Sequence, residues 1–367
     1  MVYQSGYPGF LALLLSVLLL PLTAMAEGET GADSVPAPPK KELGKLRRMI
    51  RGFSEIDTRY IEPQHYNYTV MLQSTTTYDF YRLSSVNGQT VTFSPDVLMK
   101  VGPYVGWRWF FLGYTFDLKN IGVSGNDLKK EIDFSIYSSQ IGIDLFYRRT
   151  GNDYKIREVR LGDNIDTTPL DGVGFNGVEV GITGVNLYYI FNHKRFSYPA
   201  AFAQSTCQKV SCGSWMAGFG YMKNSLEFDY RKLEEVVENT CGVEQFEVDS
   251  GLRFNKVRYY DYHVSAGYAY NWVFAPQWLF CASAQLALAY KRSTGDTDSD
   301  QDFSFNNFNF DSIGRFGLVF NNTRWYAGAS AIVRSYNYRK ERFATNNIFG
   351  SLNIYVGYNF GKKKRYR

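Results

Sequence analysis

Two residues with catalytic potential, His263 and Ser265, stand two positions apart in a stretch that alternates apolar and polar side chains. In a β-strand such a pair lies on one face, where a histidine could deprotonate a serine hydroxyl. A hydrolase would also need a polar group that orients the imidazole and an oxyanion hole. Both residues fall on the polar face of the stretch, away from any lipid. The sequence therefore predicts no complete catalytic site.

The acidic residues Asp296, Asp298, Asp300 and Asp302 alternate in one loop and faintly resemble a calcium-binding loop. Such a loop needs glycine at its sixth position and glutamate at its twelfth. These positions hold Gln301 and Asn307. The three histidines of the chain are scattered. We therefore expect a solvated acidic loop, no metal site and no cofactor.

The chain has four cysteines, and two of them, Cys207 and Cys212, flank a short connection that we expect to be external. An exported protein meets an oxidising compartment, where a disulfide between such neighbours is stable. The sequence therefore makes a Cys207–Cys212 disulfide possible and leaves the state of these two thiols open. Cys281 falls on the polar face of its stretch and is expected to be a packed or free thiol.

The stretches that position these residues alternate apolar and polar side chains with a period of two residues from Asn67 onward. Residues 257–274 are the clearest case, because aromatic and aliphatic side chains occupy the even positions from Tyr260 to Phe274, whereas the odd positions include Asp261, His263 and Asn271. Residues 278–290 and 352–360 repeat the pattern. This alternation predicts strands with one apolar and one mixed face. The rings expected near the ends of the apolar face are Tyr260, Tyr262, Tyr270, Trp272, Phe274, Trp278, Tyr290, Tyr358 and Phe360.

Strand length distinguishes a soluble sandwich from a membrane barrel. Strands of soluble sheets have a modal length of about five or six residues. The twelve steps from Tyr260 to Trp272 cover about 40 Å at about 3.3 Å per residue. At a tilt of about 45° this projects to roughly 28 Å, close to the apolar band of an outer-membrane barrel with its aromatic girdles. The length favours a barrel whose apolar face meets lipid.

Connection lengths predict the number of strands. Tight turns expected at Gly106, 150–153, 192–194, 223–224, 275–276 and 321–322 alternate with longer external connections, which include 207–211. This alternation gives 14 strands. The stretches 195–203 and 225–230 are the weakest strands, so 12 is the alternative. The predicted fold is an all-β, transmembrane, antiparallel up-and-down barrel of 12–14 strands.

The ends of the chain differ from the barrel in composition. Residues 1–26 read as a signal peptide, with a 13-residue apolar run before a small-x-small pattern that ends at Ala26. Residues 27–56 read as a periplasmic linker with a short basic amphipathic segment, and residues 57–360 as the barrel. Residues 361–367 form a basic periplasmic tail that contains Lys362, Lys363, Lys364, Arg365 and Arg367. We expect this tail to be disordered when free.

Charge and hydropathy exclude two classes of protein. The net charge is +5, and the last seven residues hold five positive charges, so the rest of the chain is neutral. A nucleic-acid-binding protein normally carries its basic residues on the folded body. Apart from the N-terminal run, no stretch approaches the length of a membrane helix, which excludes a polytopic helical protein.

Five stretches resemble an outer-membrane barrel family known as domain of unknown function 4421, found mainly in Bacteroidetes. They are residues 60–73, 100–118 (KVGPYVGWRWFFLGYTFDL), 143–157 (IDLFYRRTGNDYKIR), 184–206 (GVNLYYIFNHKRFSYPAAFAQST) and 213–221 (GSWMAGFGY). The similarity runs from about Asp57 to Phe360. It implies an exported outer-membrane barrel of Gram-negative bacteria and no particular activity or functional residue.

Three functions are compatible with this sequence. The first is a small, porin-like pore or transporter for solutes or lipids. The second is a structural or surface-interaction barrel, and the third is an outer-membrane lipid or glycan hydrolase. The expected partners are outer-membrane lipid, the barrel-assembly machinery, and the cell wall or a periplasmic partner at the basic tail, but not nucleic acid. The expected location is the cell outer membrane.

Overall fold

The computed structural model describes residues 55–107, 110–113, 116–117, 130–149, 153–162, 165–296, 303–339 and 343–366. The predicted signal peptide, linker and basic amphipathic segment up to residue 54 lie outside the described residues, as do Asp298, Asp300, Asp302 and Arg367.

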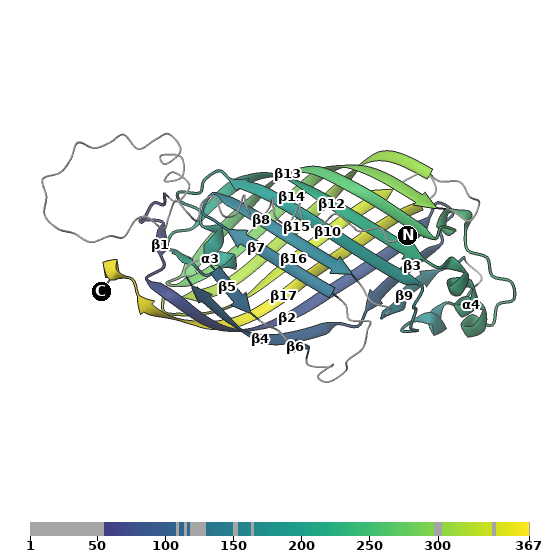
Figure 1. Cartoon of the computed structure of the whole chain (residues 1–367), viewed down its shortest axis with the longest axis horizontal. Helices are drawn as coiled ribbons and strands as arrows, with labels where there is room; N and C mark the ends of the chain where they lie inside the picture. Colours follow the sequence, from purple (N-terminus) through teal and green to yellow (C-terminus); the bar gives the residue numbers. More distant parts are fainter. Residues whose placement is uncertain are drawn as a thin grey trace, which may run out of the picture. The chain divides into compact units, whose positions relative to one another are not determined.

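An antiparallel sheet rolls into a barrel in which neighbouring strands follow one another up and down (Figure 1). The hydrogen-bonded order is β5-β4-β2-β17-β16-β15-β14-β13-β12-β10-β8-β7, with β6 beside β4. In chain order the strands are β2 (Tyr66–Ser85), β4 (Leu98–Trp107), β5 (Phe110–Gly113), β6 (Phe116–Asp117), β7 (Lys130–Tyr137), β8 (Ile141–Arg149), β10 (Val178–Ile190), β12 (Cys212–Phe228), β13 (Lys256–Ala275), β14 (Trp278–Asp296), β15 (Phe303–Asn321), β16 (Trp325–Arg339) and β17 (Phe343–Lys362).

The described strands occupy twelve positions around the barrel, because β5 and β6 pair with successive parts of β4. The predicted antiparallel up-and-down barrel is confirmed, with the lower strand count. The two stretches that raised the count to 14 are not separate strands. Residues 195–203 contain the helix α3 (Tyr198–Phe202), and residues 225–228 complete β12.

Three predicted connections are wrong. Residues 223–224 lie within β12, where Lys223 pairs with Tyr260 and Asn224 with Tyr259. Strand β8 ends at Arg149, at the end with the long connections, and the tight turn beside it is instead at 138–140, between β7 and β8. Residues 150–152 of the predicted turn lie outside the described residues. Residues 207–211 lie at the same end as 192–194, because the chain enters and leaves α3 there.

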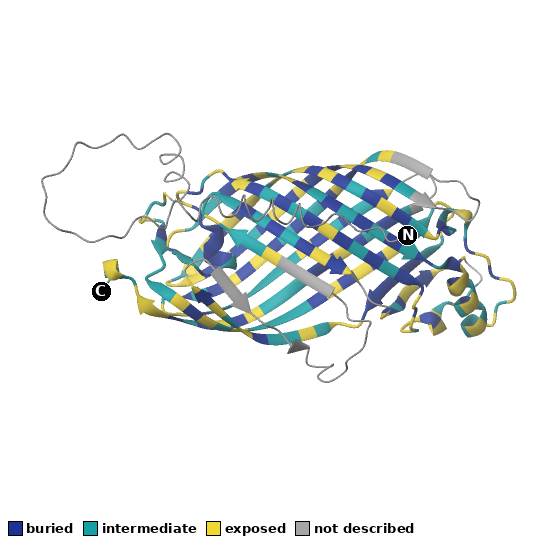
Figure 2. Ribbon diagram, viewed as in Figure 1, coloured by how far each residue is buried: buried dark blue, intermediate teal, exposed yellow. Residues whose placement is uncertain are grey.

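Side chains along the strands alternate between a buried inner face and an exposed outer face (Figure 2). On β13 the even positions point outward, with Tyr262 56% and Trp272 54% exposed. Of the nine predicted girdle rings, Tyr260 and Tyr358 are half-buried and the other seven are exposed. Their predicted outward orientation agrees with the structure.

Short elements close both ends of the barrel. Figure 1 places α3, β1 (Ile61–Pro63) and the C-terminus at one end, and α4 (Tyr230–Cys241) with β9 (Tyr154–Arg160) at the other. The Ser197 side chain accepts a hydrogen bond from Ala200 N at the start of α3, and Asp229 accepts one from Lys232 N at the start of α4. Gly242 ends α4 with a φ of 67°, in the left-handed region that glycine tolerates. No helix in the described ranges is long and apolar enough to cross a membrane.

The remaining elements are small. The strand β3 (Thr90–Pro95) pairs with the outer end of β2 and with β9. The strand β11 (Thr206–Gln208) pairs with β1 in a separate two-stranded sheet. Three single-turn 3-10 helices are η1 (Thr168–Leu170), η2 (Ser250–Leu252) and η3 (Lys364–Tyr366).

Candidate functional site

Side chains cross the interior of the barrel at mid-height. The guanidinium of Arg315 on β15 donates to the carboxylate of Asp144 on β8, and both side chains are 1% exposed. In the sheet order β15 and β8 are five positions apart, nearly opposite one another in a ring of twelve. Arg334 on β16, six positions from β8, lies 5.2 Å from the Phe146 ring centroid. These contacts span the diameter of the lumen.

A second level of contacts crosses the interior closer to the long connections. The Tyr81 hydroxyl on β2 lies 3.2 Å from the Tyr259 hydroxyl on β13, again five positions away. Arg148 on β8 lies over the Phe349 ring of β17 at 4.6 Å. Tyr81, Tyr259, Arg148 and Phe349 are all buried. The barrel is therefore filled at two heights by bulky side chains from opposite walls.

Between these levels lies a fully buried cluster of charges. Lys291 Nζ is 3.1 Å from Asp261 Oδ2 and 3.0 Å from Asp311 Oδ2, and all three side chains are at most 1% exposed. Lys291 Nζ also donates to the Asn337 carbonyl at 2.8 Å. Two carboxylates around one ammonium, each with further hydrogen bonds, are the arrangement that makes buried charges tolerable.

The candidate catalytic residue His263 belongs to this cluster. Its Nδ1 lies 3.0 Å from Asp261 Oδ1, and its Nε2 lies 2.7 Å from Asn186 Oδ1. Ser265 lies on the same inner face, as predicted, and is half-buried. Both ring nitrogens already have partners, so the imidazole holds its neighbours in place rather than activating Ser265. This geometry gives the hydrolase hypothesis no support.

The helix α3 fills the lumen at the end that carries the C-terminus. Its residue Tyr198 is fully buried, donates to Ser283 Oγ at 3.0 Å and accepts from Arg315 Nη1 at 3.3 Å. Asn271 on β13 donates to the carbonyl of Ser197 at 2.8 Å. Gln204, which follows α3, donates to the Tyr355 hydroxyl at 2.7 Å. These bonds fix α3 to four strands around the barrel wall.

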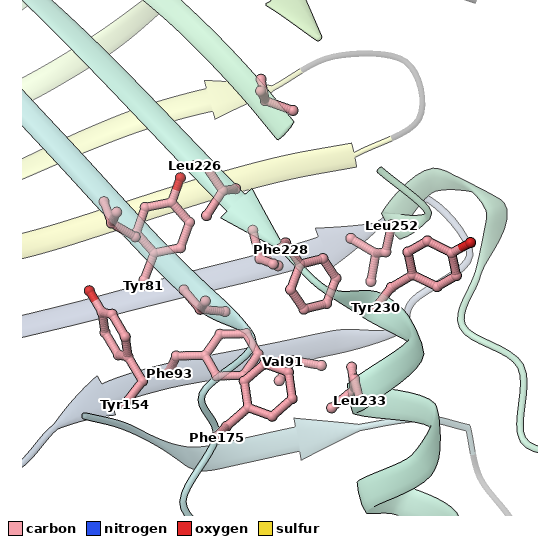
Figure 3. Close-up of a cluster of buried hydrophobic side chains, with 14 of the residues drawn as sticks. Tyr81, Val91, Phe93, Tyr154, Phe175, Leu226, Phe228, Tyr230, Leu233 and Leu252 are labelled. Atoms are coloured by element: carbon pink, nitrogen blue, oxygen red, sulfur yellow. The ribbon is translucent and has the colours of Figure 1, made fainter. Parts of the chain in front are cut away.

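The strands β3 and β9 and the helix α4 form an ordered cap at the opposite end of the barrel (Figure 3). Phe93 of β3 stacks on Phe175 at 5.1 Å between ring centroids, and Phe228 at the end of β12 packs against both rings. Leu233 and Val237 of α4 join the same cluster with no exposed surface. This hydrophobic core continues from the barrel interior into the cap, so the cap is part of the folded body.

Ion pairs join neighbouring segments at the surface of the cap. Asp96 accepts from Lys155 Nζ at 2.7 Å and from Arg157 Nη2 at 3.0 Å, which ties β9 to the loop after β3. The hydrogen bond from Lys155 lowers the pKa of the Asp96 carboxyl, and the charge of Arg157 adds to the effect. Because all three side chains are at least one third exposed, solvent screens the pair and its stabilisation is small.

One sector of the inner wall is half-buried and polar. Gln73 and Thr75 on β2 donate to the side-chain carbonyl of Asn353 on β17 at 3.1 and 2.8 Å. Nearer the C-terminal end of the barrel, a small pocket is lined by Gln64, Asn67, Thr69, Gln204 and other residues. The pocket is also lined by the ring of Tyr326, and Gln73 pairs with Tyr355 across the strands. This sector therefore combines polar side chains with tyrosine rings.

The basic tail folds back on the chain. Strand β17 continues to Lys362, two residues beyond the predicted boundary at 360, and Lys362 pairs with Tyr66. Lys363 donates from its backbone to the His65 carbonyl and from Nζ to the Gln64 carbonyl, both at 2.9 Å. The Tyr366 ring lies 4.0 Å from the His65 ring. The tail is therefore ordered up to residue 366 rather than disordered as predicted.

The possible Cys207–Cys212 disulfide is not formed in the structure, in which all four cysteines are free thiols. The expected tight hairpin between them does not exist, because Cys207 belongs to β11 and Cys212 begins β12. Burial raises the pKa of the Cys207 thiol to about 12, which makes it a poor nucleophile. Cys281 is a buried packed thiol, as predicted.

Four functional candidates, Arg315, Asp144, Lys291 and Asp311, were not identified from the sequence. The alternation places them on inner faces, but it does not show which side chains they meet inside the barrel. In the described residues no group of three or more His, Cys, Asp or Glu side chains is arranged to hold a metal ion.

Comparison with protein families gives one match. The family model described as Domain of unknown function (DUF4421) matches residues 55–360, most of the chain and all twelve barrel positions. The chain belongs to this family. The match covers the barrel, both crossing levels and the cap, so these features lie within the DUF4421 domain. A search of curated proteins finds no match.

Solved structures with a similar architecture are outer-membrane proteins. The outer-membrane protease OmpT from Escherichia coli is 8% identical, with 83% of this chain and 100% of that chain covered and a TM-score of 0.37. The translocator domain of the autotransporter NalP from Neisseria meningitidis is 9% identical (86% and 93% covered, TM-score 0.33), and the toluene transporter TodX from Pseudomonas putida is 7% identical (83% and 98%, TM-score 0.23). These proteins have different activities, and none of them extends to this chain.

Proposed function

We propose that this DUF4421 protein is an integral outer-membrane barrel with a closed lumen, which acts as a structural or surface-interaction protein through its ordered cap. The observation that carries the proposal is the pair of crossing levels, Arg315–Asp144 and Tyr81–Tyr259, which join opposite walls. A barrel of twelve strands is wide enough to leave a channel unless large side chains fill it. Here Arg, Tyr and Phe side chains and α3 fill it.

The outer surface supports the membrane location. Exposed apolar side chains cover the outward positions, among them Val264, Leu286 and Ile354, which are 57–68% exposed. A surface this apolar is unfavourable in water and is expected where strands face lipid. Because external connections are the longer ones in such barrels, the end with α4 and β9 is assigned to the cell exterior.

The cap supplies the interaction surface. The external segment 229–255 carries seven acidic and three basic side chains. Its apolar residues pack inward, whereas Glu235 and Glu247 point to solvent. An ordered acidic surface on a rigid base suits the binding of a cationic partner with little loss of conformational freedom.

Conductance in planar bilayers tests the closed lumen. We expect wild-type protein purified from outer membranes to migrate faster unheated than heated on detergent gels, as a folded barrel does, and to produce no stable channel steps. Proteoliposomes should not swell in small sugars. Reproducible steps from heat-modifiable protein would contradict the closed lumen, whereas recovery as a soluble periplasmic protein would contradict the membrane location.

A pore or transporter is the second candidate, and the half-buried polar sector at Gln73, Thr75 and Asn353 favours it. In that case the contacts of α3 would have to break before a solute could pass. Shortening Tyr198 to Ala would then raise conductance in a barrel that still shows heat-modifiable migration. In the closed barrel that we propose, the variant changes stability but not conductance.

The basic tail is proposed to contact an anionic periplasmic surface, such as the cell wall. The side chains of Lys364 and Arg365 are exposed, and their charges are unpaired by any carboxylate in the described residues. Each cation near an anionic surface contributes about 1 kcal/mol at low salt. Lys363 is instead bound to Gln64, so the exposed charges beyond the end of β17 begin at residue 364.

Replacing Lys364, Arg365 and Arg367 with Gln should weaken the co-sedimentation of the protein with cell-wall material at low salt. The barrel should stay folded, because β17 ends at Lys362 and keeps its pairing with Tyr66. Sedimentation with purified cell wall at increasing salt measures the effect, and heat-modifiable migration checks folding. If the variant sediments like the wild type, the tail only anchors the lower rim.

A further inference from the structure

On five neighbouring strands, one row of mostly aromatic outward side chains separates apolar side chains from cationic ones. The strand register places Val185, Tyr221, Tyr262, Tyr290 and Phe308 side by side across β10, β12, β13, β14 and β15. Tyr262 and Phe308 are 56% and 65% exposed. This row is an aromatic girdle, which marks the boundary between hydrocarbon and headgroups. Its side towards the long connections is the external headgroup region.

Cations occupy the two rows immediately external to this girdle. The first row is Thr183, Lys223, Tyr260, Arg292 and Asn306, and the second is Arg149, Gly181, Ser225, Arg258 and Thr294. Neither row contains a carboxylate. Acidic residues return only in the next row, with Glu179 and Glu227. The two rows therefore carry four positive charges at one depth.

Three of these cations, Lys223, Arg258 and Arg292, form the cationic triad. Lys223 lies 5.9 Å from the Tyr260 ring, and no described carboxylate forms an ion pair with any of the three. Arg149, by contrast, is paired with Glu179 at 2.5 Å. The two arginines of the triad are exposed, and Lys223 is half-buried. The triad thus keeps its charge available for an external anion.

The spacing of the triad suits a phosphate group. Lys223 and Arg292 stand on strands two apart, so their Cα atoms are about 10 Å apart, and Arg258 lies between them about 7 Å further along its strand. Long side chains from such a triangle can converge on one anion. Arginine binds phosphate through two parallel N–H donors, and lysine adds a point charge.

We propose that the triad of Lys223, Arg258 and Arg292, with Tyr260 at its centre, binds the phosphate of an anionic lipid in the outer leaflet. The proposal rests on the outer-membrane location proposed above, because only there is lipid phosphate held at this depth. The aromatic girdle two residues away would pack on the acyl chains of the same lipid. The site thus selects lipids by headgroup charge.

Diphosphoryl lipid A and its dephosphorylated form, each in phosphatidylcholine nanodiscs with the full chain, test the proposal by native mass spectrometry. We expect wild type to retain the phosphorylated lipid, and the variant with Lys223→Gln, Arg258→Gln and Arg292→Gln to lose at least about tenfold of this preference. The matched control is Arg157→Gln, Arg160→Gln and Lys232→Gln, which removes the same charge from the cap. The control should bind like wild type.

Several outcomes would overturn the site. The triad variant could retain the lipid like wild type, or the control could lose as much, which would indicate unspecific attraction. Equal retention of the dephosphorylated lipid, or full competition by inorganic phosphate, would exclude a lipid phosphate as the ligand. Failure of the wild type to insert into nanodiscs would instead contradict the membrane location, so the two failures are distinguishable.

Discussion

Replacement of Arg315 with Met is expected to lower the free energy of unfolding of the barrel by about 3–5 kcal/mol. The substitution keeps most of the side-chain volume but leaves the Asp144 carboxylate, 1% exposed, without its cation. It also removes the donor to the Tyr198 hydroxyl and so loosens α3. Urea unfolding of vesicle-inserted protein, followed by tryptophan fluorescence and heat-modifiable migration, measures the loss.

The double variant Arg315→Met, Asp144→Asn separates charge from packing. With both charges removed, most of the lost stability should return, because the cost arises from one unpaired buried charge. Arg157→Met is the exposed control, whose pair with Asp96 is worth less than about 1 kcal/mol. Additive losses from the two single substitutions would mean that Arg315 and Asp144 do not interact, and the lumen would then not be crossed at this height.

Introduction of arginine at Ala266 is expected to cost about 2–4 kcal/mol or to block insertion. Ala266 is exposed on the outer face of β13, between Ala217 of β12 and Leu286 of β14. It lies four residues from Tyr262 in the girdle, well inside the apolar band. Folding yield into vesicles and unfolding in urea measure the effect.

The control is an arginine introduced on the same outer face but closer to the external end of the barrel. Thr183→Arg, on the outer face one row external to the girdle, should cost only about 0–1 kcal/mol. The sequence pattern alone would favour Ser265→Arg as the control, because Ser265 lies on the inner face. The structure makes it unsuitable, because the interior is packed there: a Cβ added to Gly218 would lie only 3.0 Å from Ser265 Oγ. Equally small costs at 266 and 183 would contradict the position of Ala266 in the apolar band.

The long strands of the C-terminal half could be predicted from the sequence because each alternates between two different environments. On β13 the even side chains meet lipid and the odd ones meet the lumen, which produces the period-two pattern over 20 residues. The strands β14 and β17 follow the same rule. Their order and antiparallel pairing follow from short connections.

The wrong predictions of turns and strands arise where the surroundings of a segment do not alternate between lipid and lumen. Lys223 and Asn224 resemble a turn, yet they are consecutive residues of β12. Lys223 is half-buried on the outer face and Asn224 is buried on the inner face, so the strand holds two successive polar residues there. Residues 196–202 are mostly apolar like a strand, but residues 198–202 form α3 because the lumen offers an apolar environment away from lipid. Neither environment is visible in a local pattern.

The lumen contacts could not be predicted for a different reason. Whether Arg315 meets Asp144 depends on the stagger of five strand pairs between them, and a shift of any pair by two residues would preserve every local alternation. Sequence periodicity specifies which face a residue occupies. It does not specify which residue lies across the barrel.

The pairing of β17 with β2 has a consequence for assembly kinetics. These strands pair over their whole length, and Asn67 donates to the Gly361 carbonyl across a separation of 294 residues. Closing a loop of that length costs about 5 kcal/mol of chain entropy, whereas β13 and β14 are joined through two residues and can zip at once. Until β17 is exported, β2 has an unpaired edge, and such edges promote aggregation. The first barrel strand to leave the inner membrane must therefore be shielded until the last one arrives.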